Sequence, residues 1–344
     1  MTIHKYCANG NDFLIFHTFM QQDFATLARG LCHRHSGIGA DGLVVLLPHL
    51  PPHTLDSGAT SSTKPPESTP TLPPIAYRWD FYNADGSRAN MCGNASRCVA
   101  HYAYQMGLAP AKHAFITSVQ HDIIEVCVES SPQDRTQAQE SMPQVSGAMA
   151  CAIVASNLGR YRDLTTLPAG RDVLPDMPMP ASLADLGMEW AYIDTGVPHV
   201  VGFLPDHRLL QDLIAKDTSI SAEILSFMRA LRRHYNANVN LAYAQSPDLI
   251  YLATYERGVE DITLACGTGM AAVLLVGHIM LGLDSRATLI PPSGERLCLW
   301  CEHVGLESKA DSSARGVDSA YPAMRVFLQG EVRLVAVCET GLGF

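Results

Sequence analysis

Two cysteines, Cys92 and Cys266, stand directly before apolar runs that predict helices. Each is followed by a glycine and then by a small polar residue, in Gly93-Asn94 and in Gly267-Thr268. A helix N-terminus stabilises a thiolate through its backbone N–H groups and dipole, lowering the thiol pKa from about 8.5 to between about 3.5 and 7.5. We therefore expect both cysteines to transfer protons near neutral pH.

Two thiols of this kind, one from each half of the chain, suit a symmetric proton transfer. One would remove a proton from a carbon atom and the other would return a proton to the opposite face. A stereocentre is then inverted without net redox change. The glycine after each cysteine lets a ligand approach the backbone closely, and the N–H groups there can hold a carboxylate. The residues alone leave open that both cysteines are inert and buried at tight turns.

Composition narrows the classes of partner. The formal net charge is −10, and the charged residues form no basic stripe, so we expect no nucleic acid and no membrane surface as partner. No apolar run reaches the roughly 18 residues that a membrane span needs. Residues 1–13 lack the pattern of a secretion signal, so we expect a cytoplasmic protein. The 10 cysteines are dispersed, which favours reduced thiols over a disulfide framework.

The order of predicted elements favours an α+β fold. Strands occur in runs separated by one helix, then two helices, then one helix, which differs from the strict alternation of a doubly wound sheet. We expect two similar domains over residues 1–150 and 151–328, each carrying one of the two cysteines and wrapping a sheet round one helix. Residues 51–74 and 130–147 are polar and are predicted to be insertions rather than domains.

Eight sequence blocks, in the order in which they occur here, resemble those of the diaminopimelate epimerase family. Together they extend over most of the chain outside the predicted insertions. The blocks are GNDF (Gly10–Phe13), RHSGIGADG (Arg34–Gly42), FYNADGS (Phe81–Ser87), MCGNASRC (Met91–Cys98), TGVPHVV (Thr195–Val201), NVN (Asn238–Asn240), YERGV (Tyr255–Val259) and ACGTG (Ala265–Gly269).

This resemblance implies an isomerase that converts LL-diaminopimelate to meso-diaminopimelate in lysine and peptidoglycan precursor biosynthesis. It implies no cofactor and no metal, because two cysteines exchange the α-proton, one as thiolate and one as thiol. The implied fold has two domains, each a curled, mostly antiparallel sheet round a central helix, with the active site in the cleft between them. Residues 329–344 are then expected to return to the first domain, and the protein is expected to be a homodimer.

The resemblance also implies a role for each candidate site residue. Cys92 and Cys266 would be catalytic. The remaining residues would bind the amino-acid substrate: Gly93, Asn94, Gly267 and Thr268 at the reacting centre, and Asn11, Asn83, Asn240, Glu256 and Arg257 at the distal end. This division suits the chemistry, because arginine is a bidentate clamp for a carboxylate and glutamate pairs with an ammonium group.

Three positions differ from the family pattern. Gly42 stands where a glutamine is usual, Val197 where an asparagine is frequent, and Ala95 where a glycine is usual. The first two changes affect the distal contacts. A racemase of the same fold that acts on a proline-like or histidine-like amino acid is therefore the alternative to a diaminopimelate epimerase.

Two other classes of protein are alternatives to these isomerases. A thiol oxidoreductase would use Cys298 and Cys301 as a C-x-x-C motif, although the segment is strand-like and lacks a thioredoxin-type setting. A non-catalytic amino-acid-binding protein would bind the same ligand without exchanging its α-hydrogen. Residues 32–35, Cys-His-Arg-His, contain metal-ligand types, but no second cluster completes a zinc site, so no metal is expected.

Overall fold

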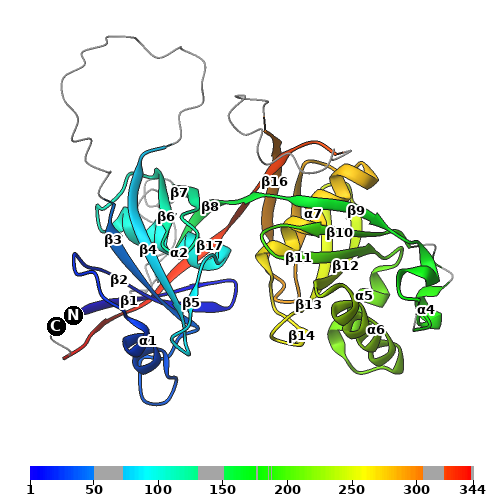
Figure 1. The fold of residues 1–344 in the computed structure, drawn as a ribbon, viewed down its shortest axis with the longest axis horizontal. Helices are drawn as coiled ribbons and strands as arrows, with labels where there is room; N and C mark the ends of the chain where they lie inside the picture. The colour runs from blue at the N-terminus through cyan, green and yellow to red at the C-terminus, as the bar shows by residue number, and fades with distance from the viewer. Residues whose placement is uncertain are drawn as a thin grey trace, which may run out of the picture. The chain divides into compact units, whose positions relative to one another are not determined.

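The structure is a computed structural model that divides into two compact units (Figure 1). Unit 1 comprises Met1–Val154 and Val332–Phe344, and unit 2 comprises Ala155–Glu331. The predicted insertions, 51–74 and 130–147, lie almost wholly outside the described residues. The structure describes residues 1–49, 73–130, 151–175, 177–184, 186, 188–304 and 321–341.

Each unit contains both strands and helices, which confirms the α+β class. Strands β8 (Cys151–Arg160) and β17 (Met324–Glu339) each run from one unit into the other. The other elements of unit 1 are β1 (Thr2–Ala8), β2 (Asn11–His17), α1 (Ala25–Cys32), β3 (Gly42–Pro48), β4 (Ile75–Asn83), β5 (Arg88–Ala89), α2 (Gly93–Gln105), β6 (Lys112–Thr117) and β7 (Ile123–Ser130).

Unit 2 contains more helices around a similar set of strands. Its elements are β9 (Arg162–Leu167), the 3₁₀ helix η1 (Gly170–Val173), α4 (Ala181–Ala184), β10 (Trp190–Asp194), β11 (Pro198–Phe203), α5 (His207–Ala215), α6 (Ser219–Tyr235), β12 (Asn238–Ser246), β13 (Leu249–Glu256), β14 (Asp261–Ile262), α7 (Gly267–Leu281), β15 (Arg286–Ile290) and β16 (Leu297–His303).

In unit 1 the sheet curls round α2. Its strands lie in the order β17-β1-β2-β3-β4-β6-β7, with β2–β3 and β4–β6 parallel and the other neighbouring pairs antiparallel. Apolar residues of α2, such as Cys98 and Tyr102, share one core cluster with side chains from β1, β2, β3, β4, β6, β7, β8 and β17. Because these strands contribute side chains to one cluster with the helix, α2 is the centre of the unit.

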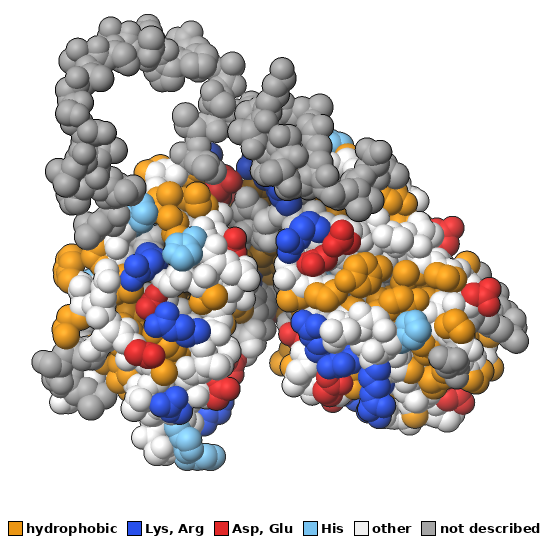
Figure 2. Space-filling view, viewed as in Figure 1, with side chains coloured by type: hydrophobic (Ala, Val, Ile, Leu, Met, Phe, Trp, Pro, Cys, Tyr) orange, Lys and Arg blue, Asp and Glu red, His pale blue; other side chains and the backbone are white. Residues whose placement is uncertain are grey.

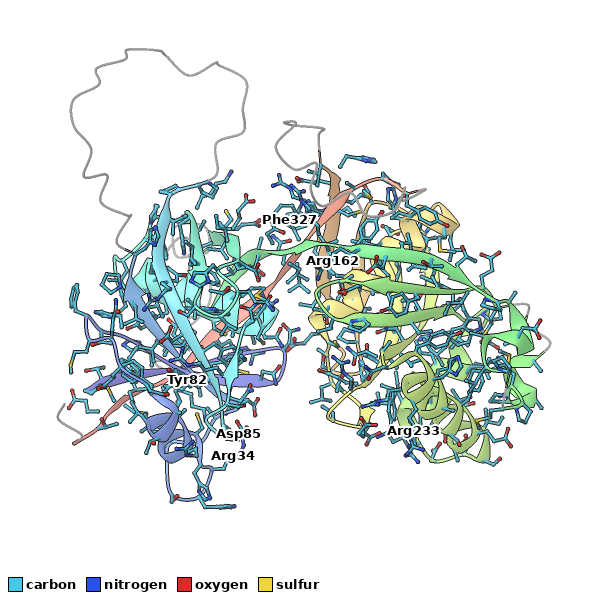
Figure 3. The ribbon with its side chains drawn as sticks, viewed as in Figure 1. Arg34, Tyr82, Asp85, Arg162, Arg233 and Phe327 are labelled. Atoms are coloured by element: carbon cyan, nitrogen blue, oxygen red, sulfur yellow. The ribbon has the colours of Figure 1, made fainter. Side chains whose placement is uncertain are left out.

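Successive strand residues point to opposite faces of a sheet, so α1 packs on the outer face. Leu14, Leu43 and Tyr82 form a second cluster with apolar residues of α1. The Tyr82 hydroxyl also accepts a hydrogen bond from the backbone N–H of Phe24, at 3.2 Å, just before α1 begins (Figure 3). The segment that leads from β2 to β3 is thereby fixed against β4.

Unit 2 repeats this topology round α7. Its strand order is β9-β10-β11-β12-β13-β15-β16-β17, with β11–β12 and β13–β15 parallel. Helix α7 is buried over Gly269–Gly277, as expected for a helix that is apolar on every side. Helices α5 and α6 cover the outer face, and Arg233 lies on the exposed side of α6 (Figure 3).

The strand registers relate individual residues of the two units. Tyr82 pairs with Leu43 and Tyr255 pairs with Val239, and both tyrosines are buried under the outer helices. The next residues along β4 and β13 are Asn83 and Glu256, so these two candidate site residues occupy equivalent positions. Helices α2 and α7 are equivalent in the same sense, because each joins two parallel strands.

The surface carries charges of both signs. On the face shown in Figure 2, Lys and Arg side chains lie among Asp and Glu side chains on each unit, with no extended patch of one sign. Within the described residues, no helix is both long enough and apolar enough to span a membrane.

Candidate active site

Cys92 is the N-cap of α2. Its backbone is extended, with φ −147° and ψ 119°, and its carbonyl accepts the first helical hydrogen bond, from Ser96 N at 2.9 Å. The Cys92 side chain is half-buried, whereas Cys98 in the same helix is fully buried, and burial raises the pKa of the Cys98 thiol. Of these two α2 cysteines, only Cys92 lies at the helix end with access to solvent.

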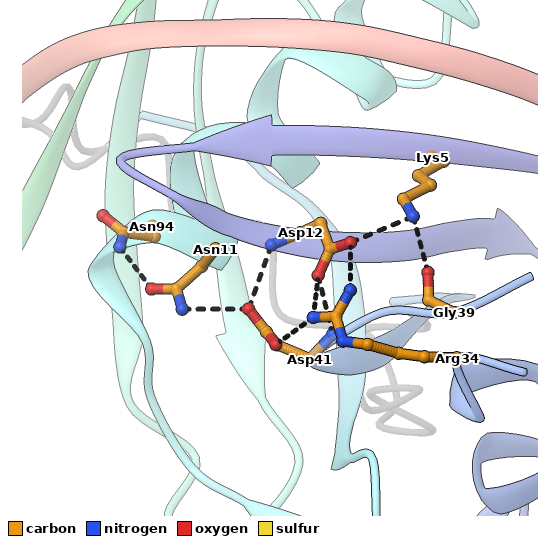
Figure 4. A network of polar contacts seen from close by, with 7 residues as sticks. All are labelled: Lys5, Asn11, Asp12, Arg34, Gly39, Asp41 and Asn94. Atoms are coloured by element: carbon orange, nitrogen blue, oxygen red, sulfur yellow. Dashed lines mark hydrogen bonds and ion pairs between the residues drawn. The ribbon is translucent and has the colours of Figure 1, made fainter. Parts of the chain in front are cut away.

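A chain of amide side chains leads away from the start of α2 (Figure 4). Asn94 Nδ2 donates to Asn11 Oδ1 at 2.7 Å, and Asn11 Nδ2 donates to Asp41 Oδ2 at 3.0 Å. Two predicted substrate-binding residues, Asn94 and Asn11, are therefore in direct contact. Their orientation is set by the Asp41 carboxylate, which comes from the loop before β3.

An ion cluster holds this carboxylate in place. The Arg34 guanidinium donates to both carboxylate oxygens of Asp12, at 3.1 and 2.9 Å, and to Asp41 at 2.6 Å. Lys5 Nζ lies 3.0 Å from Asp12 Oδ2 and donates to Gly39 O at 2.7 Å. Burial opposes ionisation of Asp12, but hydrogen bonds from Arg34 and Lys5 outweigh it and hold the Asp12 pKa below its usual range.

Sequence reasoning assigned no role to these ionic residues, although Asp12, Arg34 and Asp41 lie within the blocks GNDF and RHSGIGADG. Arg34 and Asp41 are seven residues apart in the chain and 2.6 Å apart in space. Lys5, Asp12 and Arg34 come from β1, β2 and the turn after α1. The antiparallel pairing of β1 with β2 and the parallel pairing of β2 with β3 bring them together, and no single-sequence spacing predicts the second pairing.

Arg97, which lies one turn into α2, is fully buried. Its guanidinium donates to Gly93 O at 3.1 Å, to Asn94 Oδ1 at 2.8 Å and to Asn9 Oδ1. These contacts join the first turn of the helix to the β1–β2 turn. The Asn94 amide is thus held at both atoms, Nδ2 by Asn11 and Oδ1 by Arg97.

Asn83 ends β4 and is exposed. Its backbone N–H donates to Ser87 O at 2.8 Å, and its Nδ2 donates to Ser87 Oγ at 2.9 Å. The same turn exposes Asp85, which accepts from Ser87 and is labelled in Figure 3. Asn83 thus closes its own turn in this structure, while its side chain remains accessible to a ligand.

Cys266 is the N-cap of α7, as Cys92 is of α2. Its backbone is again extended, with φ −125° and ψ 110°, and its carbonyl accepts from Met270 N at 2.9 Å. The residue is 8% exposed, and its Sγ lies 3.4 Å from the Thr268 hydroxyl. Thr195 Oγ1 donates to Thr268 O at 3.0 Å and fixes the first turn of the helix. A Cβ added at Gly267 would meet no atom within 4 Å, so the backbone there is open to a ligand.

Asn240, another predicted substrate-binding residue, is fully buried. Its Oδ1 accepts from Thr254 Oγ1 at 2.8 Å, and its Nδ2 donates to Val200 O at 3.1 Å and contacts His199 Nδ1 at 3.0 Å. A Cβ at Gly269 would lie 2.6 Å from Asn240 Oδ1. In this geometry Asn240 supports the start of α7 and has no exposed surface for a substrate.

His199 joins Asn240 to the segment that carries Arg257. Its Nε2 lies 3.5 Å from Asn238 Nδ2, and Asn238 Oδ1 accepts from Arg257 N at 2.8 Å. Burial, together with the positive charge of Arg257, lowers the pKa of His199 to about 3. The imidazole is therefore neutral.

Glu256 and Arg257 end β13 in different environments. Glu256 is half-buried, and burial raises the pKa of its carboxyl group. Arg257 is exposed, with its guanidinium donating to Asn236 O at 3.1 Å. Both lie on the β13–β14 hairpin, which leads directly to Cys266, so unit 2 gathers its predicted site residues at one end of α7.

The oxidoreductase hypothesis is not supported by the positions of its cysteines. Cys298 and Cys301 both lie on β16, and residues three apart on a strand point to opposite faces. Cys301 is buried in the α7 core, where burial raises its pKa to about 11. Neither cysteine forms a disulfide.

The Cys-His-Arg-His segment forms a turn. His33 Nδ1 accepts from Ser36 N at 3.1 Å, and Cys32 is buried against the outer sheet face. Among the described residues, no group of three or more His, Cys, Asp or Glu side chains has an arrangement that would hold a metal ion.

The same fold occurs in solved structures of other proteins. A phenazine biosynthesis protein of the PhzF family from Bacillus anthracis and a probable proline racemase from Agrobacterium radiobacter K84 each match with a TM-score of 0.56 and 11% identity. Both matches cover 99% of this chain, and they cover 99% and 93% of the respective structures. The chain therefore has the fold of PhzF-type and proline racemase-type proteins.

Sequence comparison is more specific. A family model described as diaminopimelate epimerase matches residues 3–134. The diaminopimelate epimerase of Helicobacter pylori (strain ATCC 700392 / 26695) is 38% identical over 338 residues, covering 96% of this chain and 99% of that protein. The chain belongs to the diaminopimelate epimerase family.

The close approach of Gly269 to Asn240 predicts a test of the α7 start. Gly269→Ala would place a methyl group 2.6 Å from Asn240 Oδ1 and 2.8 Å from Thr254 Oγ1. We expect the variant to lose about 1–3 kcal/mol of unfolding free energy, measured by urea denaturation. Gly267→Ala is the matched control, because its Cβ would meet open space, and it should unfold like the wild type. Equal stability of the two variants would contradict this account.

The neutral, buried His199 predicts that acid destabilises the fold. Its folded pKa of about 3 lies below the ordinary histidine value of 6.5, so only the unfolded state binds this proton between those values. The free energy of unfolding should fall as pH drops from 6.5 towards 3, and His199 should contribute no pH dependence above 6.5. His199→Asn should show a smaller loss between pH 7.5 and pH 5 than wild type, whatever its absolute stability. His35→Gln, at an exposed site, should keep the wild-type dependence.

Proposed function

We propose that this protein is a diaminopimelate epimerase, which interconverts LL- and meso-diaminopimelate in the formation of lysine and peptidoglycan precursors. The observation that carries the proposal is the 38% identity to a diaminopimelate epimerase over 96% of the chain. The chemistry of the site agrees, because both motif cysteines are N-caps of central helices. No redox or group-transfer step is needed.

In the proposed mechanism, the thiolate of one cysteine removes the α-proton and becomes a thiol. The thiol of the other cysteine donates its proton to the opposite face of the carbon and becomes the thiolate. Charge that develops towards the α-carboxylate is stabilised by backbone N–H groups of Gly93-Asn94 and Gly267-Thr268, which start the two helices. The same N–H groups and helix dipoles favour each thiolate when it forms.

The distal end of the substrate is assigned to the residues that close the equivalent strands β4 and β13. Arg257 would bind the distal carboxylate and Glu256 the distal ammonium group. Asn83 and Asn11 would form hydrogen bonds with the same distal end of the substrate. Asn240 acts in this proposal as a positioning residue, because its amide is occupied by Thr254, His199 and Val200.

Gly42 bears on the alternative of a related racemase. A Cβ at Gly42 would lie 2.7 Å from the Phe81 ring and 2.8 Å from Tyr82 O, so the space beside the backbone is already filled. The glutamine that the family usually has at position 42 would therefore not fit beside this backbone. Glu256 and Arg257 still provide opposite charges for a second amino-acid head group, which a proline-like or histidine-like substrate lacks. This difference favours diaminopimelate.

The proposal includes three features of the whole assembly. Units 1 and 2 act as domains that place Cys92 and Cys266 on opposite sides of one α-carbon in the cleft between them. The protein works in the cytoplasm as a homodimer with a small-molecule substrate, as the family resemblance implies. Because one cysteine accepts the α-proton and the other donates its replacement, the reaction uses no cofactor.

The decisive experiment follows hydrogen exchange at the α-carbon. Wild-type protein is incubated with LL- or meso-diaminopimelate in heavy water, and deuterium at the α-carbon is followed by NMR together with the isomer ratio. We expect deuterium in the product isomer, since its α-proton comes from a solvent-exchanged thiol. Cys92→Ser and Cys266→Ser should each lower kcat/KM by about 10²–10⁴-fold, the usual range for a lost proton-transfer group. Binding without exchange would indicate an amino-acid-binding protein instead.

The distal clamp has its own test. Arg257→Gln removes the charged donor for the distal carboxylate and should lower kcat/KM for diaminopimelate by about 10–100-fold, since a charged hydrogen bond is worth about 1.5–3 kcal/mol. Arg233→Gln, on the exposed side of α6, is the matched control and should leave the rate unchanged. If proline or histidine isomers exchanged faster than diaminopimelate, the related racemase would be the better assignment.

A further inference from the structure

The two repeated helix starts differ in one buried charge. Cys92 and Cys266 are N-caps, and the fifth residue after each is buried against the interior of its unit. That residue is Arg97 in α2 and Ala271 in α7. A guanidinium is positively charged at every pH at which the protein is folded. The first turn of α2 therefore carries a full positive charge that the first turn of α7 lacks.

The contacts of Arg97 place its guanidinium group against the first turn of α2. Its Nη1 donates to the backbone oxygen of Gly93, the residue that follows Cys92, at 3.1 Å. Its Nη2 donates to Asn94 Oδ1 at 2.8 Å and to Asn9 Oδ1, which are both neutral acceptors. Its charge also acts on the thiol of Cys98, where it favours the thiolate against the larger effect of burial.

The other ionic groups near the start of α2 nearly cancel. Lys5, Asp12, Arg34 and Asp41 are two cations and two anions joined in one cluster. Within α2, burial lowers the pKa of His101 to about 4, so that imidazole is neutral at pH 7.

The strands packed against α2 add little charge on its side. On β1, burial raises the pKa of Tyr6, so its hydroxyl stays neutral. On β7, the core residues alternate with Glu125 and Glu129, so these carboxylates lie on the outer face. On β2, His17 contacts the hydroxyl of Tyr102, in the third turn of the helix.

The segment that leads to α7 carries one neighbouring pair of opposite charges. Glu256 and Arg257 are adjacent on the hairpin that leads to Cys266, and His199 is neutral because burial lowers its pKa to about 3. The Thr268 hydroxyl, 3.4 Å from Cys266 Sγ, can accept from the thiol or donate to the thiolate. It therefore tolerates both protonation states.

From this asymmetry we propose that Arg97 makes Cys92 the thiolate of the resting protein and leaves Cys266 as the thiol. Within the proposed epimerase, on which this consequence rests, Cys92 is the base for the isomer whose α-hydrogen faces unit 1. Turnover of that isomer leaves a Cys92 thiol and a Cys266 thiolate, the less stable pair. A proton must then move from Cys92 to solvent, and another from solvent to Cys266, before the resting state returns.

The test measures the ionisation of each thiol separately in the full-length protein. Cys266→Ser is used to titrate Cys92, and Cys92→Ser to titrate Cys266, by the pH dependence of iodoacetamide alkylation at each cysteine, resolved by peptide mass spectrometry. We expect the pKa of Cys92 to lie at least about one unit below that of Cys266, as a nearby opposite charge provides. Equal values, or a lower value for Cys266, would overturn the proposal.

Substitution of Arg97 then assigns the cause. In the Cys266→Ser background, Arg97→Gln should raise the Cys92 pKa by about one unit or more, and Arg97→Lys should retain most of the wild-type value. In the Cys92→Ser background, Arg97→Gln should leave the Cys266 pKa unchanged, which serves as the matched control. A Cys92 pKa that does not respond to Arg97→Gln would overturn the assignment to Arg97. If Arg97→Gln fails to fold, the comparison of the two cysteines still decides the order of ionisation.

These measurements do not depend on epimerase activity. Alkylation reports the thiolate whether or not diaminopimelate is the substrate. Failure of the proposed function would appear as absent deuterium exchange with the wild-type protein, while the order of the two pKa values would stand. Conversely, an active enzyme with the opposite order of ionisation would overturn only the role of Arg97.

Discussion

The site depends on the placement of a helix inside a curled sheet, with its N-terminus left open. The first N–H groups of a helix have no partner within it and must be satisfied by side chains, water or a ligand. At the starts of α2 and α7 the N-cap is a cysteine whose side chain makes no capping hydrogen bond. Each helix therefore keeps donors available for an anion, while its sides remain buried in strand residues.

The surrounding polar network keeps those helix starts rigid. In unit 1, ionic residues orient the Asn94–Asn11–Asp41 chain, and Arg97 holds the first turn from within. In unit 2, the neutral residues Asn240, Thr254 and His199 form the hydrogen bonds that support the start of α7. The units thus share a topology but stabilise their helix starts with different chemistry. That difference allows two thiols with the same backbone setting to have different acidities.

Much of this arrangement could be predicted from sequence. The run-like order of strands and helices gave the α+β class, because periodicity and turn residues are local properties. Both helix starts were found from a cysteine, a glycine and a following apolar run.

Other parts could not be predicted, for physical reasons. The motif of Asn240 does not predict that its amide is buried and bonded to Thr254, His199 and Val200. The roles of Arg34, Arg97 and His199 depend on strand pairings between distant segments, and a single sequence does not encode those pairings in any short spacing.

The path of β17 has a consequence for how the chain matures on the ribosome. Its residues Arg333–Glu339 pair with β1, and Val332 belongs to the core round α2. Unit 1 therefore contains both early-translated and late-translated strands, and all of unit 2 is synthesised between them. The nascent N-terminal segment must wait with one edge of β1 unpaired until that late strand emerges. The Cys92 helix would therefore acquire its complete enclosure only after unit 2 has been synthesised.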